Sequence, residues 1–383
     1  MDSVLADFVA KGELVGVGGL VARHGKVVHR FHLGGKSLAP ADPLEQDTIF
    51  RIFSMTKPVT AVAMMMLHEE GLWSLDDPIA RHLPEFADVR VLAGVNGDGS
   101  LRTEAPDHPP TMRELMSHTA GLAYGFDPAD PVDLAYITAG VWGADDLREM
   151  ARRVSSAPLA YQPGSRWRYS MGMEIEGALI EVLTGQSLPD FMRERIFRPL
   201  GMVDTDFCVA ADKVHRLATV YRKTDEAGWI VMDQPPYVQD PLIIPKLPMG
   251  GGGLYSTIDD YARFAQLILD GGRLGDVRLL SEDSIRLMTT NVLSDELQAG
   301  GYGIGLQQIR PGFGHALNGA VFHDPAAAGS RVGMGTYQWD GAAGTWFWVD
   351  PANDLICVGM IQRLLGKPHL QAITQDLIAD ALI

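Results

Sequence analysis

Cysteine and long apolar runs are both scarce in this chain. Of its 383 residues only Cys208 and Cys357 are cysteine, and neither stands in a Cys-x-x-Cys pair. Two such thiols cannot form a disulfide framework, so we expect free thiols in a reducing compartment. The longest strongly apolar run, residues 61–67, is far shorter than the ~20 residues that span a bilayer. No basic segment followed by an apolar one opens the chain, so we predict no secretory leader, no membrane span and a cytoplasmic location.

Basic residues are also under-represented. Lysine and arginine total 32 against 48 aspartate and glutamate, which gives a formal net charge of −16. This excess of acid argues against nucleic acid and anionic membranes as partners, because both would repel most of the surface. A hydrophobic content of 46% with 21% charged residues excludes a disordered chain. The sequence leaves open whether the protein forms a homo-oligomer.

Strand patterns lie at the two ends of the chain, and helical patterns dominate between them. Residues 14–23 and 26–33 predict a hairpin, and three further strands followed by a helix over residues 370–382 are expected near the C-terminus, at 335–339, 345–349 and 355–362. Helices are expected over residues 111–117 and 173–183 and after Thr257. We therefore predict an α+β fold in which an antiparallel sheet from both termini is flanked by helices. Residues 1–77 and 226–383 would form this sheet domain, and residues 78–225 an inserted, mainly helical domain.

A serine and a lysine precede the most apolar helix of the chain. Ser54 and Lys57 stand three residues apart, and residues 59–70 are apolar on nearly every face. Because Pro58 suits the first helical turn, the helix should begin at or just after Ser54. The hydroxyl would then lie at the positive helix end with an amine one turn away, which suits a serine nucleophile. A helix-capping serine beside a lysine at the edge of the core is the plainer interpretation, and this segment alone leaves both open.

Five segments together point to a known family. They are residues 54–57 (Ser-Met-Thr-Lys), 113–122 (Arg-Glu-Leu-Met-Ser-His-Thr-Ala-Gly-Leu), 169–171 (Tyr-Ser-Met), 250–260 (four glycines, then Leu-Tyr-Ser-Thr-Ile-Asp-Asp) and 339–345 (Trp-Asp-Gly-Ala-Ala-Gly-Thr). In this order they resemble the motifs of the serine β-lactamase and penicillin-binding-protein superfamily, and most closely those of family VIII carboxylesterases. The resemblance implies a β-lactamase-like fold.

The resemblance also implies a role for each catalytic group. Ser54 would be the nucleophile, Tyr169 the general base and Lys57 the cation that favours the phenolate. The backbone N–H groups of Ser54 and Ala342 would hold the oxyanion. We take the segment around His118 as structural, holding the site wall.

Trp339, Gly341 and Met171 would contact the substrate. His315 is a rival anchor for the third motif, but the residues that follow it fit poorly. We expect the loops of residues 88–110 and 219–249 to wall the cleft, and the glycine run at residues 250–253 to be a tight passage beside it.

Departures from the superfamily's pattern indicate the reaction class. No Lys-Thr/Ser-Gly occurs, since Lys223-Thr224 is followed by Asp225, and Met171 replaces the asparagine expected two residues after Tyr169. Both changes replace polar recognition by apolar surface, which suits an uncharged ester. No Gly-x-Ser-x-Gly elbow is present, and nothing in the sequence implies a metal or cofactor.

The sequence therefore predicts a serine carboxylesterase that cleaves short-chain esters through an acyl-Ser54 intermediate. Acyl transfer to an alcohol other than water is the nearest alternative. β-Lactamase or D-amino-acid peptidase activity and a non-catalytic penicillin-binding-like protein follow it.

Overall fold

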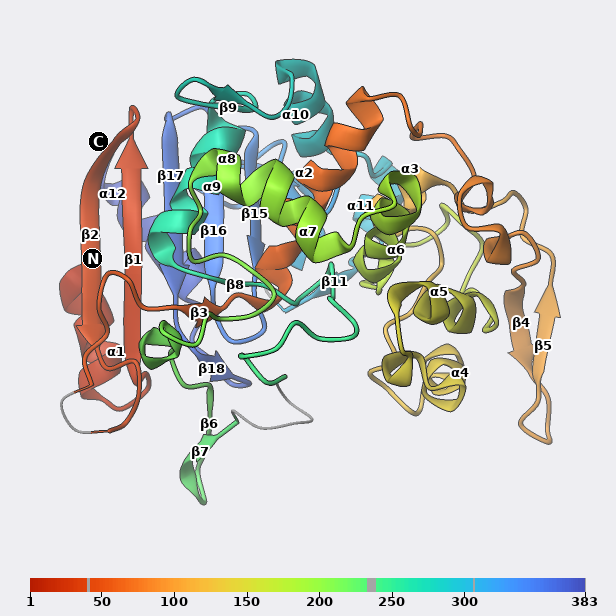
Figure 1. Cartoon of the computed structure of the whole chain (residues 1–383), viewed down its shortest axis with the longest axis horizontal. Coiled ribbons are helices and arrows are strands. Elements are labelled where there is room, and N and C mark those ends of the chain that lie inside the picture. The colour runs from red at the N-terminus through yellow and green to blue at the C-terminus, as the bar shows by residue number, and fades with distance from the viewer. Residues whose placement is uncertain (40–41, 233–238, 306, 383) are drawn as a thin grey trace.

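A seven-stranded antiparallel sheet forms the centre of the computed structural model, which describes residues 1–39, 42–232, 239–305 and 307–382 (Figure 1). Its strands run in the order β13–β14–β15–β16–β17–β1–β2. Their bounds are β1 (Gly16–Arg23), β2 (Lys26–Gly34), β13 (Phe313–His315), β14 (Ala320–Phe322), β15 (Thr336–Asp340), β16 (Trp346–Asp350) and β17 (Leu355–Met360). Because β1 pairs with β17, the sheet joins both ends of the chain. The predicted terminal sheet is thus confirmed, and it gains β13 and β14, which are too short to show a strand pattern.

Alternating side chains of β16 bury the two faces of the sheet in different cores. Trp346 and Trp348 pack against α1 (Asp2–Ala10) and α12 (Leu370–Ala381). Phe347 points the other way and meets Tyr261 of α9 (Ile258–Leu269), with ring centroids 5.1 Å apart. This period of two is the pattern of a strand that is covered on both sides.

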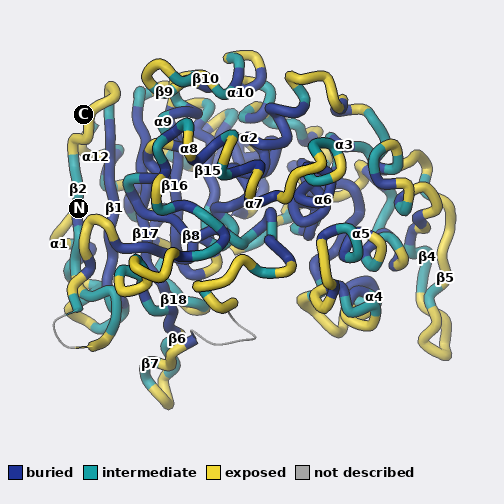
Figure 2. Tube along the Cα trace, in the orientation of Figure 1, coloured by how far each residue is buried: buried dark blue, intermediate teal, exposed yellow. Residues whose placement is uncertain are grey.

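Helix α2 (Thr56–Glu69) lies in the middle of the larger core. All of its residues from Thr56 to Leu67 are buried, and Figure 2 shows it as a dark segment among buried strands and helices. Such burial explains why its sequence is apolar on nearly every face. The residues at the start of α2 therefore sit on a rigid support.

A helical part lies to one side of the sheet part (Figure 1). It contains α3 (Met112–Met116), α4 (Pro131–Ala139), α5 (Leu147–Ser155) and α6 (Gly172–Thr184), and the hairpin of β4 (Val91–Val95) and β5 (Leu101–Glu104) lies at its outer edge. Helix α6 packs against α2, α3 and α5. It thereby joins the helical part to the core that holds α2.

The remaining elements are short. The helices are α7 (Leu188–Met192), α8 (Arg198–Leu200), α10 (Glu282–Thr289) and α11 (Asp295–Ala299). The strand pairs are β3 (Phe50–Arg51) with β8 (Tyr255–Ser256), β9 (Arg273–Leu274) with β10 (Val277–Arg278), and β11 (Gly303–Ile304) with β12 (Gln307–Gln308). In the described ranges no helix combines the length and hydropathy that crossing a bilayer requires.

The stretch from residue 203 to 224 belongs with the sheet part, although we expected it in the inserted helical domain. Its strand β6 (Tyr221–Thr224) pairs with β7 (Gly228–Val231) on one side and with β18 (Arg363–Leu364) on the other. Leu217 forms a β-bridge with Ile49. In this structure the second half of the stretch thus pairs with strands of the sheet part, and residues 78–225 as an inserted domain stay a prediction.

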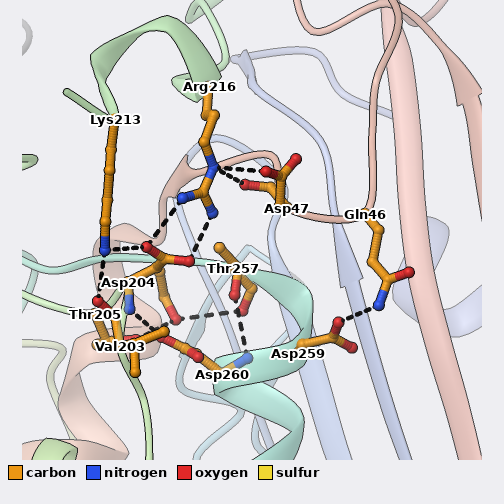
Figure 3. A network of polar contacts seen from close by, with 11 residues as sticks. Gln46, Asp47, Val203, Asp204, Thr205, Lys213, Arg216, Thr257, Asp259 and Asp260 are labelled. Carbon is orange, nitrogen blue, oxygen red and sulfur yellow. Dashed lines mark hydrogen bonds and ion pairs between the residues drawn. The ribbon is translucent and has the colours of Figure 1, made fainter.

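Charged side chains fasten the same stretch to α9 and its surroundings (Figure 3). Arg216 pairs with Asp204 at 2.6 Å and with Asp47 at 3.0 Å. The carboxylate of Asp260, in the first turn of α9, accepts from the Asp204 N–H at 2.7 Å and from the Thr205 hydroxyl at 2.9 Å. Charge pairs with several partners hold a fixed geometry better than isolated surface pairs do. This local network was not visible in the sequence because its members are far apart in the chain.

Candidate active site

Ser54 lies in a tight turn that leads directly into α2. The turn covers Phe53–Met55, and Phe53 has a φ of 46°, in the left-handed region that non-glycine residues seldom adopt. The hydroxyl of Thr345 donates to the carbonyl of Ile52 at 3.0 Å and so holds the turn against the sheet. The Ser54 side chain therefore stands at the positive end of a buried helix, as predicted.

The three side chains predicted to act together meet at the Ser54 hydroxyl. Ser54 Oγ lies 2.7 Å from Tyr169 Oη and 3.2 Å from Lys57 Nζ. The Lys57 ammonium group is fully buried, donates to the carbonyl of Gly251 at 2.7 Å and lies 4.7 Å from the centre of the Tyr169 ring. An alcohol, an amine and a phenol are thus within hydrogen-bonding or electrostatic reach of one another.

His118 fixes the backbone around Tyr169. Its carbonyl accepts from the Arg168 N–H at 3.0 Å, and its Nδ1 accepts from the Ser170 N–H at 3.2 Å. Its imidazole lies 5.0 Å from the Tyr169 ring. Burial, with the nearby charges of His315 and Lys57, holds the pKa of His118 well below its ordinary value, so the ring is neutral and Nδ1 can accept.

The glycine run passes close behind Lys57, as expected. A Cβ added to Gly250 would lie 2.3 Å from the carbonyl oxygen of Met173. A Cβ added to Gly251 would lie 2.4 Å from a carboxylate oxygen of Glu174. Side chains at these positions would push the chain away, and Lys57 would lose its carbonyl partner.

The turn after β15 forms the opposite wall. A Cβ on Gly341 would come within 2.4 Å of the Ile52 carbonyl, so the turn lies directly against the segment that precedes Ser54. Ala342 lines the pocket, and among the described residues nothing accepts a hydrogen bond from its N–H. A free donor near a nucleophile is what an oxyanion site requires.

A pocket of about 390 Å³ opens over Ser54 and Tyr169. Its wall is largely aromatic and apolar and includes side chains that sequence reasoning missed: Tyr124, Phe126, Trp142 and Ile304. Tyr124 and Phe126 follow closely on the segment 113–122, and that proximity to a motif was a usable signal. Trp142 and Ile304 come from distant segments of the chain and carried no such signal.

Two expectations about the pocket wall differ from the structure. Met171 is fully buried in the core and is absent from the pocket wall, because its N–H bonds to the carbonyl of Ala123 and its side chain packs inwards. No residue of the loop 88–110 reaches the pocket, since that loop forms the outer hairpin of β4 and β5. From the loop 219–249, Met249 is the one described residue on the wall.

Residues 1–381 match the family model described as Beta-lactamase. The chain belongs to the β-lactamase family.

Three relatives that align over most of the chain are informative. Protein Rv1367c of Mycobacterium tuberculosis is 38% identical over 357 residues, which are 92% of this chain and 86% of that protein. Esterase EstB of Burkholderia gladioli is 32% identical over 375 residues, which are 93% of this chain and 88% of the EstB chain. The solved structure of EstCE1, described as a hydrolase with promiscuous acyltransferase activity, superposes with a TM-score of 0.82 at 27% identity and covers 100% of this chain and 97% of that one. This β-lactamase-family chain therefore has the family's fold over its full length.

Trp339, and not the rival anchor His315, lines the pocket of this β-lactamase-family protein. Trp339 stacks at 6.1 Å on Tyr169. His315 lies behind it, with ring centroids 5.5 Å apart, and is fully buried. Burial lowers its pKa to about 3, so this imidazole is neutral at physiological pH.

Two buried glutamates lie behind Lys57 on α6. Tyr124 donates to Glu174 at 3.3 Å, and Asn318 donates to Glu176 at 2.6 Å. Burial raises the pKa of both carboxyls, that of Glu176 to about 8, and the Lys57 charge opposes the rise. Sequence reasoning missed this pair, because glutamates on a helix are normally solvated and no motif marked them.

Proposed function

We propose that this β-lactamase-family protein is a serine carboxylesterase that cleaves uncharged short-chain esters through an acyl-Ser54 intermediate. One observation carries the proposal: Ser54 Oγ lies within hydrogen-bonding distance of both Tyr169 Oη and Lys57 Nζ. The largely apolar pocket beside these groups suits a neutral acyl or alcohol moiety. The likeness to EstB and EstCE1 supports the same reaction class.

In the acylation half-reaction, Ser54 Oγ attacks the ester carbonyl carbon while Tyr169 takes the hydroxyl proton. The buried side chain of Lys57, whose Nζ lies 3.2 Å from Ser54 Oγ, holds the hydroxyl in place for this transfer. The carbonyl oxygen becomes an oxyanion, which the N–H groups of Ser54 and Ala342 stabilise. Collapse of the tetrahedral intermediate breaks the bond to the alcohol oxygen, and Tyr169 returns its proton to the leaving alcohol.

Deacylation repeats these steps with water as the nucleophile. Tyr169 removes a proton from water, which attacks the acyl carbon, and the carboxylic acid leaves as Ser54 is regenerated. An alcohol in place of water would give a new ester by the same route. The promiscuous acyltransferase activity ascribed to EstCE1 favours this second candidate reaction.

The test compares p-nitrophenyl esters of increasing acyl length with nitrocefin. We expect ester turnover to exceed nitrocefin turnover, and Ser54→Ala to abolish it while the exposed-serine control Ser165→Ala retains it. Intact mass after treatment with a fluorophosphonate should show one adduct in the parent and none in Ser54→Ala. Faster nitrocefin hydrolysis, or ester turnover that survives in Ser54→Ala, would overturn the proposal.

Acyl transfer is measured in the same reaction by adding a small primary alcohol in excess. Formation of its ester at the expense of free acid, detected by mass spectrometry, would assign the second activity.

A further inference from the structure

Lys367 lies at the pocket, and the reaction steps above do not use it. It stands between β18 and α12, with 22% of its side chain exposed. Its Nζ donates to the carbonyl of Gly341 at 2.7 Å and to the carbonyl of Ala342 at 2.9 Å. A largely buried ammonium needs polar partners, and here two backbone carbonyls of one turn accept its hydrogen bonds while the Asp340 carboxylate lies 3.9 Å away.

The first of these carbonyls belongs to the same peptide group as the Ala342 N–H. In a planar trans peptide the C=O and N–H point in opposite directions. The Gly341 oxygen accepts from the ammonium and also from the Gly344 N–H at 2.8 Å. Together these two donors fix the direction of the Ala342 N–H, which leaves on the opposite side of the peptide group. Among the described residues, that N–H has no acceptor of its own.

We propose that Lys367 is a positioning residue that orients and polarises the Gly341–Ala342 peptide as an oxyanion donor. The inference rests on the proposed function, because it concerns the oxyanion of the same acyl transfer. A cation on the carbonyl oxygen draws electron density from the peptide and makes its N–H a stronger donor. A donor held in place before reaction also avoids reorganisation as the charge develops.

The surroundings of Lys367 favour this role over binding of an anionic substrate. Two of the three N–H donors of the ammonium point at carbonyl oxygens. The carboxylate of Asp340 lies 3.9 Å from Nζ, and it would oppose a second anion. Asp340 is itself held by the amide of Gln307 at 3.0 Å.

The experiment compares Lys367→Met and Lys367→Arg with the parent, using a neutral p-nitrophenyl ester and an ester that carries a carboxylate. Methionine keeps the approximate length and the apolar stem of lysine but has no charge and no N–H donor. Arginine keeps the positive charge and the N–H donors. We expect Lys367→Met to lower kcat about 10- to 100-fold on both esters, while KM stays within about threefold of the parent value. We expect Lys367→Arg to recover at least about a third of the lost kcat. Phosphonylation of Ser54 by a neutral fluorophosphonate should slow by a similar factor, because the P–O bond forms and fluoride leaves while the phosphoryl oxygen occupies the same donors.

Lys223→Met is the matched control. Lys223 also donates to a backbone carbonyl, that of Gly12 at 2.7 Å, with 28% of its side chain exposed, but it lies off the pocket. Its substitution should leave kcat unchanged. A general effect of losing a carbonyl-binding lysine would appear in both variants.

The outcomes separate the two proposals. A parent that turns over no ester would refute the proposed function, while the labelling rate of Ser54 would still report on Lys367. Unchanged kcat and labelling in Lys367→Met would overturn the positioning role. A rise in KM for the carboxylate-bearing ester alone, with kcat unchanged, would also overturn the positioning role and assign Lys367 to substrate binding. Failure of Lys367→Arg to recover activity would refute the need for a cation.

Discussion

Replacing Glu176 by glutamine should stabilise the protein, and increasingly so as pH rises. The Glu176 carboxyl is fully buried on α6 and accepts one hydrogen bond from Asn318. Burial raises its pKa to about 8, and the neighbouring Glu174 carboxylate also favours the rise, against the opposing effects of Asn318 and Lys57. The group is therefore protonated in the folded protein over most of the physiological range.

The sign and size follow from the difference between the folded and unfolded states. In the unfolded chain this carboxyl has its ordinary pKa of 4.5. Below pH 4.5 the carboxyl is protonated in both the folded and the unfolded protein. Between pH 4.5 and about 8 it is protonated only in the folded protein. In this window each pH unit therefore stabilises the unfolded state relative to the folded state by about 1.4 kcal/mol. The free energy of unfolding falls by roughly 5 kcal/mol over this window. Glutamine has no proton to lose and keeps a carbonyl oxygen for Asn318.

Guanidinium unfolding followed by tryptophan fluorescence measures the effect at about pH 5 and about pH 8.5. We expect Glu176→Gln and the parent to differ little at the lower pH, and the variant to be more stable by up to roughly 5 kcal/mol at the higher one. Glu296→Gln, at an exposed site, is the control and should show no such pH dependence. A stability difference that does not change with pH, or a variant that loses stability at pH 8.5, would refute the reasoning.

Three further predictions concern the site and the core. Tyr169→Phe and Lys57→Ala should each lower kcat on a p-nitrophenyl ester by about a thousandfold, and the double variant should lose little more, since the groups act as a unit; near-normal activity of Tyr169→Phe would show that the base is misassigned. Gly341→Ala should lower kcat by about tenfold or more, because its Cβ would lie 2.4 Å from the Ile52 carbonyl; unchanged kcat on the same ester would contradict the close packing of this turn. Trp348→Ala removes a fully buried ring between the sheet and α12. It should lower the free energy of unfolding by about 3–5 kcal/mol without changing kcat of the folded protein. A Tm equal to that of the parent in thermal unfolding would contradict this prediction.

The parts of the fold that could be predicted are those that leave a local pattern. The strands β16 and β17 are mostly apolar runs bounded by turns, and most of α2 is a long apolar stretch between a proline and a glycine. The meeting of Ser54 with Tyr169 was predicted from family motifs, because no spacing rule links two residues that are 115 positions apart in the chain.

Long-range packing decided the rest. The course of residues 203–224 depends on ion pairs such as Arg216–Asp204 and on strand pairing with β18, neither of which has a local signature. The buried state of Glu176 arises from helices that surround α6. Lys367 looks like any other residue of a connecting segment until the fold brings it against Gly341.

Lys57 belongs to a helix that is buried from Thr56 to Leu67, and Ser54 lies in the turn that leads into it. Phe126 and Trp142, which line the pocket from the helical part, are instead 64% and 38% exposed. In the proposed reaction, the groups that form and break bonds and the residues that select the ligand would thus lie on separate parts of the fold. Substitutions at Phe126 and Trp142 would then change which acyl groups enter without disturbing the packing around Ser54. Selectivity could diversify in this way while the proposed bond-breaking step is preserved.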